Sequence, residues 1–363
     1  MLILATVISL MLANSSLQIP YSNLWNFNFW GHNLIHWVND GLMTIFFLLI
    51  GLELEREIYE GELSNLKNAS LPIFGAIGGM LIPAAIFLIF NFGKDSQSGA
   101  GIPTATDIAF AIGILSLLGN RVPATLKIFL TALAVIDDLG AIIIIALFYT
   151  ASVSFLYLVL ALAVFIVLLV FNKLKVNNLI FYIIGGVLMW FLMSRSGVHP
   201  TITGVLLAFT IPFGDGGERS PSYILQHLLH KPVAFLIIPL FALANTGITI
   251  GSNIIAGLGQ DYSIGIIAGL IVGKPLGIWL FSVIGVSLGI CSLPADVKWS
   301  NILGIGFLGG IGFTMSIFIG LLAYDNQDMI NTSKIAILTG SFIAGIFGLI
   351  ILKLTLKTRE TYD

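Results

Sequence analysis

The stretch that decides the fold reads Thr131-Ala-Leu-Ala-Val-Ile-Asp137-Asp138-Leu-Gly-Ala-Ile-Ile-Ile-Ile-Ala-Leu-Phe-Tyr149. From Ile128 to Tyr149, Thr131 and the two aspartates interrupt an apolar run that is long enough to cross a bilayer. A charge near the middle of such a segment costs about 2.5–3.5 kcal/mol on insertion scales. Two adjacent carboxylates at that depth therefore indicate a functional site.

The composition of the whole chain agrees with a membrane environment. Of 363 residues, 57% are hydrophobic and only 9% are charged, whereas soluble domains carry about 25% charged residues. We therefore expect an all-α, polytopic membrane protein. The single cysteine, Cys291, excludes an intrachain disulfide, and the absence of a basic patch argues against nucleic acid as a partner. We expect no cleavable signal peptide.

Apolar runs separated by polar breaks predict about twelve transmembrane helices. The predicted spans are residues 2–14, 33–52, 71–91, 102–118, 126–149, 154–171, 178–194, 198–213, 232–250, 263–287, 301–323 and 334–354. The first of these is short for a full crossing.

The basic residues predict that both termini are cytoplasmic. With that orientation, twelve basic residues fall on the inner side and three on the outer side. The inner set is Arg56, Lys67, Arg121, Lys127, Lys173, Lys175, Arg219, Lys231, Lys298, Lys353, Lys357 and Arg359. The outer set is Lys94, Arg195 and Lys334, while Lys274 lies inside the tenth span.

Two predicted spans mix glycine with Thr or Ser where an ideal span is aliphatic. They are residues 101–113 (GIPTATDIAFAIG) and 304–316 (GIGFLGGIGFTMS). Glycine-interrupted segments in corresponding places of two halves indicate discontinuous helices around a transport site. Spans 3–5 and 10–12 would then form an inverted repeat. Close helix packing alone would also explain the glycines, but Asp107 lies inside the first break and favours transport.

Four charged residues fall inside predicted spans: Asp107, Asp137, Asp138 and Lys274. Adjacent helical residues point about 100° apart, so one aspartate of the pair can face a cavity while the other faces a neighbouring helix. Lys274 is the cation available at that depth, and a buried Lys–Asp pair is expected. Such a pair can be purely structural, but that interpretation leaves two carboxylates unexplained.

Carboxylates, the hydroxyl of Thr106 and freed backbone carbonyls offer the oxygen ligands that a small hard cation prefers. We therefore predict that Asp137 and Asp138 bind Na⁺ or Li⁺. The same carboxylates bind protons, and desolvation favours their protonated form. Competition between the two ions, combined with alternating access, would produce exchange of one for the other.

The sequence also suggests pH-responsive groups outside this cluster. Glu53 and Glu57 lie one turn apart in a cluster of five glutamates at the end of the second span, which is either an acidic, cation-gathering mouth or a solvated helix end. His199 could sense pH. His227 and His230 could form half of a metal site, but no ligand partner is near in sequence. Asp40 either lines an outer vestibule or is simply exposed.

At these residues the sequence resembles the NhaA family of sodium/proton antiporters. The resemblance rests on residues 51–57 (GLELERE), 104–113 (TATDIAFAIG), 133–149 (LAVIDDLGAIIIIALFY), 196–199 (SGVH), 273–277 (GKPLG) and 309–318 (GGIGFTMSIF). These motifs occur in the family's order over nearly the whole chain.

The resemblance implies a single transporter domain, residues 1–363, with interrupted helices 4 and 11 crossing in a core made of spans 3–5 and 10–12. Asp138 would be the principal cation-binding carboxylate, helped by Asp137 and Thr106. Lys274 would pair with Asp137 in one state. Asp107 and Lys274 would balance the half-helix dipoles at the crossing.

The family's role would be electrogenic, pH-regulated export of Na⁺ or Li⁺ against entering H⁺ in a bacterial inner membrane, without enzymatic activity or a cofactor. Glu53, Arg56 and Glu57 would form the family's pH-response region, and we add His199 to this set because histidine can sense pH. Departures include a late start, a short segment in place of the dimerising hairpin, and Glu55 where lysine is common. Gln226 replaces a glutamate linked to pH response. A homodimer is left open.

Three other functions are weaker. A sodium-coupled symporter of an organic solute would need more polar residues in the spans. An intramembrane aspartyl protease needs two converging carboxylates, and no Gly-x-Gly-Asp motif occurs. A channel would need a ring-forming filter motif.

Overall fold

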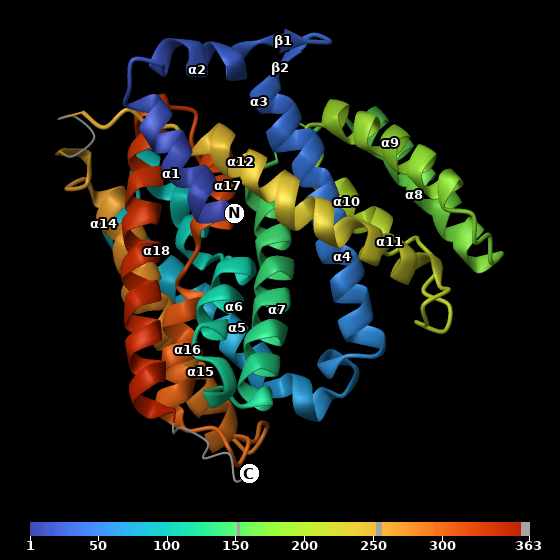
Figure 1. Ribbon diagram of the computed structural model, residues 1–363. Helices are drawn as coiled ribbons and strands as arrows, with labels where there is room; N and C mark the ends of the chain where they lie inside the picture. Colours follow the sequence, from blue (N-terminus) through green and yellow to red (C-terminus); the bar gives the residue numbers. More distant parts are fainter. Residues whose placement is uncertain (151–152, 252–255, 357–363) are drawn as a thin grey trace. The chain divides into compact units, whose positions relative to one another are not determined.

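A computed structural model describes residues 1–150, 153–251 and 256–356 (Figure 1). These residues form helices joined by short connections, with one small exception. Strands β1 (Asn28–Phe29) and β2 (His32–Asn33) pair antiparallel, with Asn28 opposite Asn33 and Phe29 opposite His32. The predicted all-α class is therefore confirmed. The predicted inner-side residues Lys357 and Arg359 lie outside the described residues.

The chain divides into two compact units, each made of two segments. The first contains Met1–Glu60 and Ile144–Ile250, and the second contains Gly61–Ile143 and Gly251–Asp363. The second unit therefore includes most of predicted spans 3–5 together with spans 10–12. Helix α7 (Ala124–Phe148) crosses the boundary, because the first unit resumes at Ile144.

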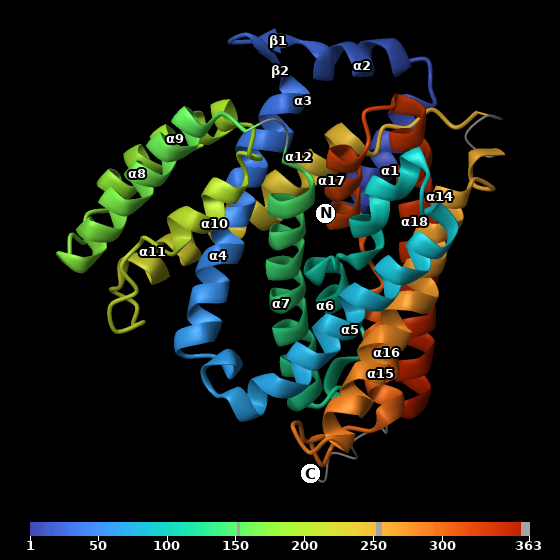
Figure 2. The ribbon, with the colours of Figure 1, turned by 180° about the vertical axis from the view of Figure 1, so that it is seen from behind.

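The first unit begins with α1 and ends with α12. Its elements are α1 (Leu2–Ala13), α2 (Gln18–Asn26), β1, β2, α3 (Leu34–His36), the π-helix η1 (Trp37–Leu42), α4 (Met43–Tyr59), α8 (Phe155–Lys173), α9 (Leu179–Ser196), α10 (Ile202–Ala208), α11 (Pro221–Pro232), the π-helix η5 (Val233–Ile237) and α12 (Ile238–Asn245). Helices α8 and α9 run side by side in both ribbon views (Figures 1 and 2). They share a buried apolar cluster with α4 and α10, including Leu52, Leu168, Tyr182, Met189 and Leu207.

The second unit repeats one order of elements. Its elements are η2 (Glu62–Ser64), α5 (Leu66–Asn91), the 3₁₀ segment η3 (Asp95–Thr104), α6 (Ile108–Ser116), η4 (Gly119–Arg121), α7, α14 (Asp261–Ala268), the π-helix η6 (Gly269–Gly273), α15 (Lys274–Ser287), α16 (Trp299–Gly309), α17 (Phe313–Ala323) and α18 (Gln327–Thr355). Each half runs from a long span through an interrupted segment to another long helix, the order that an inverted repeat requires.

Helices α5 and α15 lie against each other within this unit (Figure 2). A Cβ atom added to Gly78 would collide with the carbonyl oxygen of Gly277, and one added to Gly277 would collide with Gly78. Glycine at both positions therefore lets the two backbones touch, as small residues do between helices in membranes.

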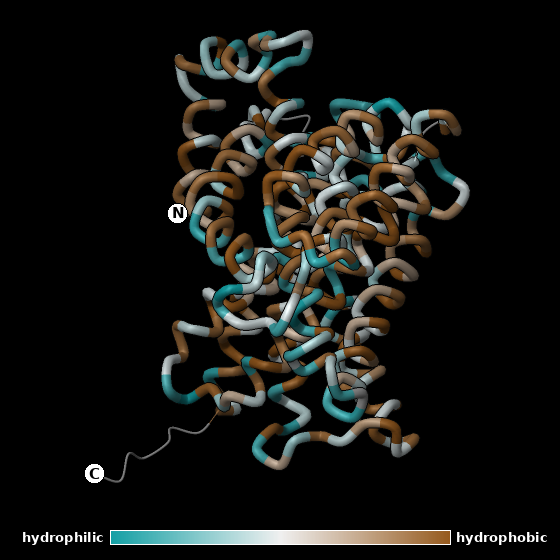
Figure 3. The backbone as a smooth tube through the Cα atoms, turned by 90° about the vertical axis from the view of Figure 1, so that its right-hand side faces the viewer, coloured by the Kyte–Doolittle hydropathy of each residue, from teal (hydrophilic) through white to brown (hydrophobic). Residues whose placement is uncertain are grey.

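Nine helices among the described residues are long and apolar enough to cross a membrane, and the number rises to eleven if each of two bent pairs is one span. The bent pairs are α1 with α2, at 114°, and α16 with α17, at 49°. Hydrophobic residues dominate the helices, while hydrophilic residues gather in many of the connections (Figure 3). The chain is therefore a polytopic membrane protein.

The predicted eighth span, residues 198–213, differs from expectation. The structure has a helix only from Ile202 to Ala208, and turns follow in which Thr210 N donates to Leu207 O and Ile211 N donates to Ala208 O. Pro212 then lacks the N–H that would continue a helix. This segment is therefore a short helix rather than a continuous span.

Candidate ion-binding site

Two interrupted segments of the second unit meet at their breaks. The chain is extended at Ala105 and at Asp107, between η3 and α6, and it leaves helix between Gly309 and Phe313. The backbone N–H of Asp107 donates a 2.6 Å hydrogen bond to the carbonyl oxygen of Ile311. A Cβ atom on Gly310 would collide with the carbonyl oxygen of Leu270, so glycine lets the second break pack closely against η6.

Asp107 joins the start of α6 to the start of α17. Its Oδ1 accepts from the N–H of Phe110 at 3.1 Å, and its Oδ2 accepts from the N–H of Thr314 at 3.2 Å and from the Thr314 hydroxyl. The rings of Phe110 and Phe313 pack edge to face with centroids 5.0 Å apart. Helix N-termini carry partial positive charge, so this carboxylate lies where two of them favour it.

Lys274 places a positive charge at the carbonyl end of η3, whereas Asp107 places a negative charge at two helix N-termini. It is the first residue of α15, and its side chain is fully buried. Its Nζ donates to the carbonyl oxygen of Thr104, the last residue of η3, and to Asp137 Oδ2 at 2.6 Å. The carbonyl ends of helices favour cations. The second unit therefore places an anion at two helix starts and a cation at a helix end.

Asp137 and Thr106 complete a buried hydrogen-bonded group with Lys274. The Thr106 hydroxyl oxygen lies 2.6 Å from Asp137 Oδ2 and 2.8 Å from the carbonyl oxygen of Gly309. Its single proton can be donated to one of the two at a time. Asp137 Oδ1 is shielded from solvent and accepts no hydrogen bond from the described parts of the chain.

Asp138 follows directly on α7 and is also buried, with 3% of its surface exposed. Because adjacent helical residues diverge by about 100°, Asp138 cannot share the direction in which Asp137 reaches Lys274. The structure thus brings Thr106, Asp137 and Lys274 into direct contact. Asp107 is next to Thr106 along the same extended segment.

The four charged side chains of this group do not balance one another. If Asp107, Asp137 and Asp138 were all ionised, three negative charges would face the single positive charge of Lys274, a net −2. Helix N-termini offset part of the charge on Asp107. Isolated buried charge is expensive, so the remaining carboxylates need protons or a cation from outside. A proton and a small cation both meet this requirement chemically.

Sequence reasoning missed Thr314, which binds Asp107 through both its N–H and its hydroxyl. The sequence signal that could have identified Thr314 is its position directly after the glycine-rich break, which matches the position of Thr106 next to the other break. The carbonyls of Thr104 and Gly309 were foreseen only as unspecified freed backbone oxygens. Their identity depends on how the two breaks meet.

The predicted pH-response residues fall in the first unit, and they occupy two places. At the end of α4, Arg56 Nη2 donates to Gly216 O at 3.3 Å, and its guanidinium lies 4.6 Å from the centroid of the Tyr223 ring. Glu53 Oε1 lies 3.8 Å from His230 Nδ1. Glu57 is half-buried on the same helix.

His199 lies elsewhere, with Asp40. Its Nε2 is 3.8 Å from Asp40 Oδ1 and its Nδ1 is 2.7 Å from the Thr201 hydroxyl, while His36 Nδ1 is 3.3 Å from Asp40 Oδ2. Asp40 precedes Glu53 by thirteen residues of one helical segment, which is about 20 Å along the axis. The structure does not bring His199 to the Glu53 group.

Glu55 is buried, whereas an acidic mouth would expose it to solvent. It is 4% exposed, and its Oε2 has no hydrogen-bond partner among the described residues. The extra glutamate therefore faces the interior of its unit. Asp40 is half-buried rather than freely exposed.

His227 and His230, which were predicted as half of a metal site, lie near the side chain of Arg56. Both histidines line a cavity of about 120 Å³ with Arg56, Tyr223 and Gln226. No three His, Cys, Asp or Glu side chains come together as a metal site within residues 1–150, 153–251 and 256–356. Any cation at Asp137 and Asp138 would therefore also need hydroxyl or carbonyl ligands.

Two interrupted segments that meet around buried carboxylates in a polytopic helical protein define an ion transporter of the discontinuous-helix class. The family model described as Na+/H+ antiporter 1 matches residues 1–352. The chain belongs to this family.

Named relatives are similar over almost their whole length. A Na(+)/H(+) antiporter NhaA of Flavobacterium psychrophilum is 65% identical over 356 residues, covering 98% of this chain and 93% of that protein. The Na(+)/H(+) antiporter NhaA 1 of Flavobacterium johnsoniae is 64% identical, covering 99% and 94%. The protein of the same type from Cytophaga hutchinsonii is 60% identical, covering 98% and 92%.

Proposed function

We propose that this protein is a secondary active antiporter that exports Na⁺ or Li⁺ in exchange for entering H⁺. The observation that carries the proposal is the buried Lys274–Asp137 pair, held with Thr106 at the meeting of two broken helices and adjacent to Asp138. The names of the full-length relatives support the two transported ions. They also favour antiport over the alternative of a sodium-coupled symporter.

In this mechanism Asp138 is the principal cation ligand, and Asp137 and Thr106 contribute further oxygens. When protons occupy the carboxylates, the cation is released. When the cation binds, it displaces protons and weakens the hold of Lys274 on Asp137. Because more than one carboxylate titrates, more than one proton can move per cation, which makes the exchange electrogenic.

Asp107 and Lys274 hold the broken helices together while access alternates. Their positions at two helix starts and one helix end support this role. The interrupted backbone can change conformation at its breaks without losing a continuous helix, as in other transporters with discontinuous helices.

The regulation follows from residues outside the ion site. Glu53, Arg56 and Glu57 respond to cytoplasmic pH. His199 and Asp40 form a second pair of titratable groups, apart from the first. We place the protein in a bacterial inner membrane with both termini cytoplasmic, as a single transporter domain that acts on Na⁺, Li⁺ and H⁺ within a lipid bilayer. It needs no cofactor, catalyses no covalent reaction, and can form a homodimer.

Exchange in sealed proteoliposomes tests the proposal. Na⁺ added outside should dissipate an imposed pH gradient, and K⁺ should do so much less. Asp138→Asn should abolish this effect, whereas Asp261→Asn, at a half-exposed ion pair with Lys94, should leave it intact. Full exchange by Asp138→Asn would show that the ion site is elsewhere. Uptake of an organic solute with Na⁺ would favour the symporter.

A further inference from the structure

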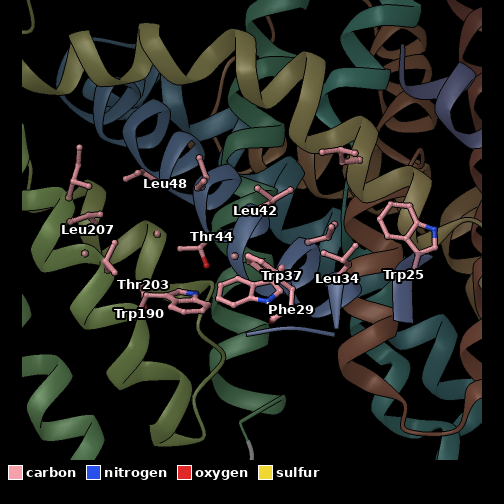
Figure 4. A pocket seen from close by; sticks show the side chains of 18 residues that line it. Trp25, Phe29, Leu34, Trp37, Leu42, Thr44, Leu48, Trp190, Thr203 and Leu207 are labelled. Atoms are coloured by element: carbon pink, nitrogen blue, oxygen red, sulfur yellow. Dashed lines mark hydrogen bonds between the residues drawn. The ribbon is translucent and has the colours of Figure 1, made fainter. Parts of the chain in front are cut away.

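The first unit contains a large apolar groove that the ion site does not use. It has a volume of about 770 Å³ and lies among α3, η1, α4, α9 and α10 (Figure 4). Its lining is almost entirely apolar. A water molecule finds few hydrogen-bond partners in such a space. A hydrocarbon chain can move there from the lipid without losing apolar contacts.

Three tryptophan side chains line this groove. The rings of Trp37 and Trp190 stack with centroids 6.1 Å apart, and Trp25 lies on the side away from Leu48 and Leu207 (Figure 4). Tryptophan is enriched at the level of lipid headgroups. The end at Trp25 therefore corresponds to the membrane surface, and the end at Leu48 and Leu207 lies deeper in the membrane.

The depth of the groove matches a single leaflet. Its wall on the span Leu34–Tyr59 runs from Leu34 to Leu48, which is about 21 Å along the helix axis. A bilayer with its headgroup regions is about 40–45 Å thick. One acyl chain can therefore lie along the groove while its headgroup stays at the Trp25 end.

Polar groups at the mouth suit a phosphate. The indole N–H of Trp25 is shielded from solvent and has no hydrogen-bond partner in the part of the chain that the structure describes. Buried indole N–H groups usually have a partner. His32 is opposite Phe29 in the hairpin, stacks on His36 at 4.2 Å and meets the Trp37 ring edge-on at 6.3 Å. Imidazole can donate to phosphate oxygens.

We propose that this groove is a phospholipid-binding site, which takes one acyl chain between α4, α9 and α10 and the lipid phosphate at Trp25 and His32. The bound lipid fills apolar space inside the first unit and supplies the acceptor that the Trp25 N–H lacks. The site involves none of the residues assigned to ion exchange.

Gly41 offers a way to fill the groove. It lines the groove, and a Cβ atom added there would meet only Trp37 Cε3 at 3.6 Å, which is ordinary contact. Gly41→Leu should therefore occupy the space without displacing the backbone. Gly113→Leu is the matched control, because a Cβ atom on Gly113 of α6 would meet nothing within 4 Å. Val187→Phe, on an exposed part of the wall, repeats the test if Gly41→Leu does not fold.

Native mass spectrometry of the full chain in mild detergent, with dioleoylphosphatidylglycerol added as the probe, measures retained lipid. The parent and Gly113→Leu should retain one molecule, and Gly41→Leu should bind about ten-fold more weakly because the space is filled. Trp25→Phe, which keeps a ring and loses the N–H, should weaken binding about five-fold. Dioleoylglycerol, which lacks the phosphate, should compete poorly.

Equal lipid retention by the parent and both filling variants would overturn the site. Equal binding of dioleoylglycerol and the phospholipid would overturn the phosphate contact. A lower dimer fraction in Gly41→Leu with unchanged lipid retention would show that a second copy of the chain, and not a lipid, covers the groove.

Discussion

Asp137 and Lys274 show how a charge becomes tolerable in a buried position. Neither side chain is exposed, and the two atoms that pair are 2.6 Å apart. Thr106 and the Thr104 carbonyl satisfy further hydrogen bonds of the pair. A buried pair of this kind contributes little net stability when intact, but it is costly to break by removing one partner.

Lys274→Ala should therefore destabilise the protein by about 3–5 kcal/mol, because Asp137 is left buried without its cation. The control is Lys94→Ala, which removes an ion pair whose side chains are 50% and 53% exposed and should cost about 0–1 kcal/mol. Thermal unfolding of both variants in the same detergent measures the difference. Equal shifts for the two would exclude a strongly coupled pair at Lys274.

At the scale of elements, function depends on where helices stop. The breaks before α6 and before α17 place two helix starts at Asp107, and the end of η3 lies at Lys274. At the end of α4, Arg56 contacts the carbonyl oxygen of Gly216 and the ring of Tyr223. Glu53 and Glu57, when ionised, contribute negative charge to this helix end.

The double variant Glu53→Gln with Glu57→Gln should move the activity–pH curve toward lower pH. Negative charge attracts protons, so nearby titrating groups hold their protons to a higher bulk pH while the glutamates are present. Without them, cations compete successfully at a lower pH. Sodium-dependent exchange by proteoliposomes, measured from acid to alkaline pH, gives the curve. A curve that does not move would indicate an ordinary solvated helix end.

The sequence predicted the parts of this architecture that follow from local composition. The cost of charge in an apolar run identified Asp137 and Asp138, and glycine with threonine identified both breaks. Features that depend on packing between elements were not predictable. Thr314 gains its contact only because two breaks meet, Glu55 is buried only by its neighbours, and the short α10 follows from its turns.

At the scale of the whole molecule, the chain combines many apolar spans with a small number of buried charges. The central claim is that protons and a small alkali cation compete for the same carboxylates. Family membership and the geometry at Asp137 support the claim from independent directions. It implies that cation binding and proton release are the two sides of a single equilibrium.

The most direct measurement adds Na⁺ to the purified full-length protein in weak buffer and follows proton release. We predict that Na⁺ and Li⁺ release protons, that the apparent affinity for Na⁺ falls as the pH is lowered, and that K⁺ has little effect. Asp138→Asn should abolish the release, while Asp261→Asn should preserve it. Binding of Na⁺ by the parent protein without any proton release would contradict the account.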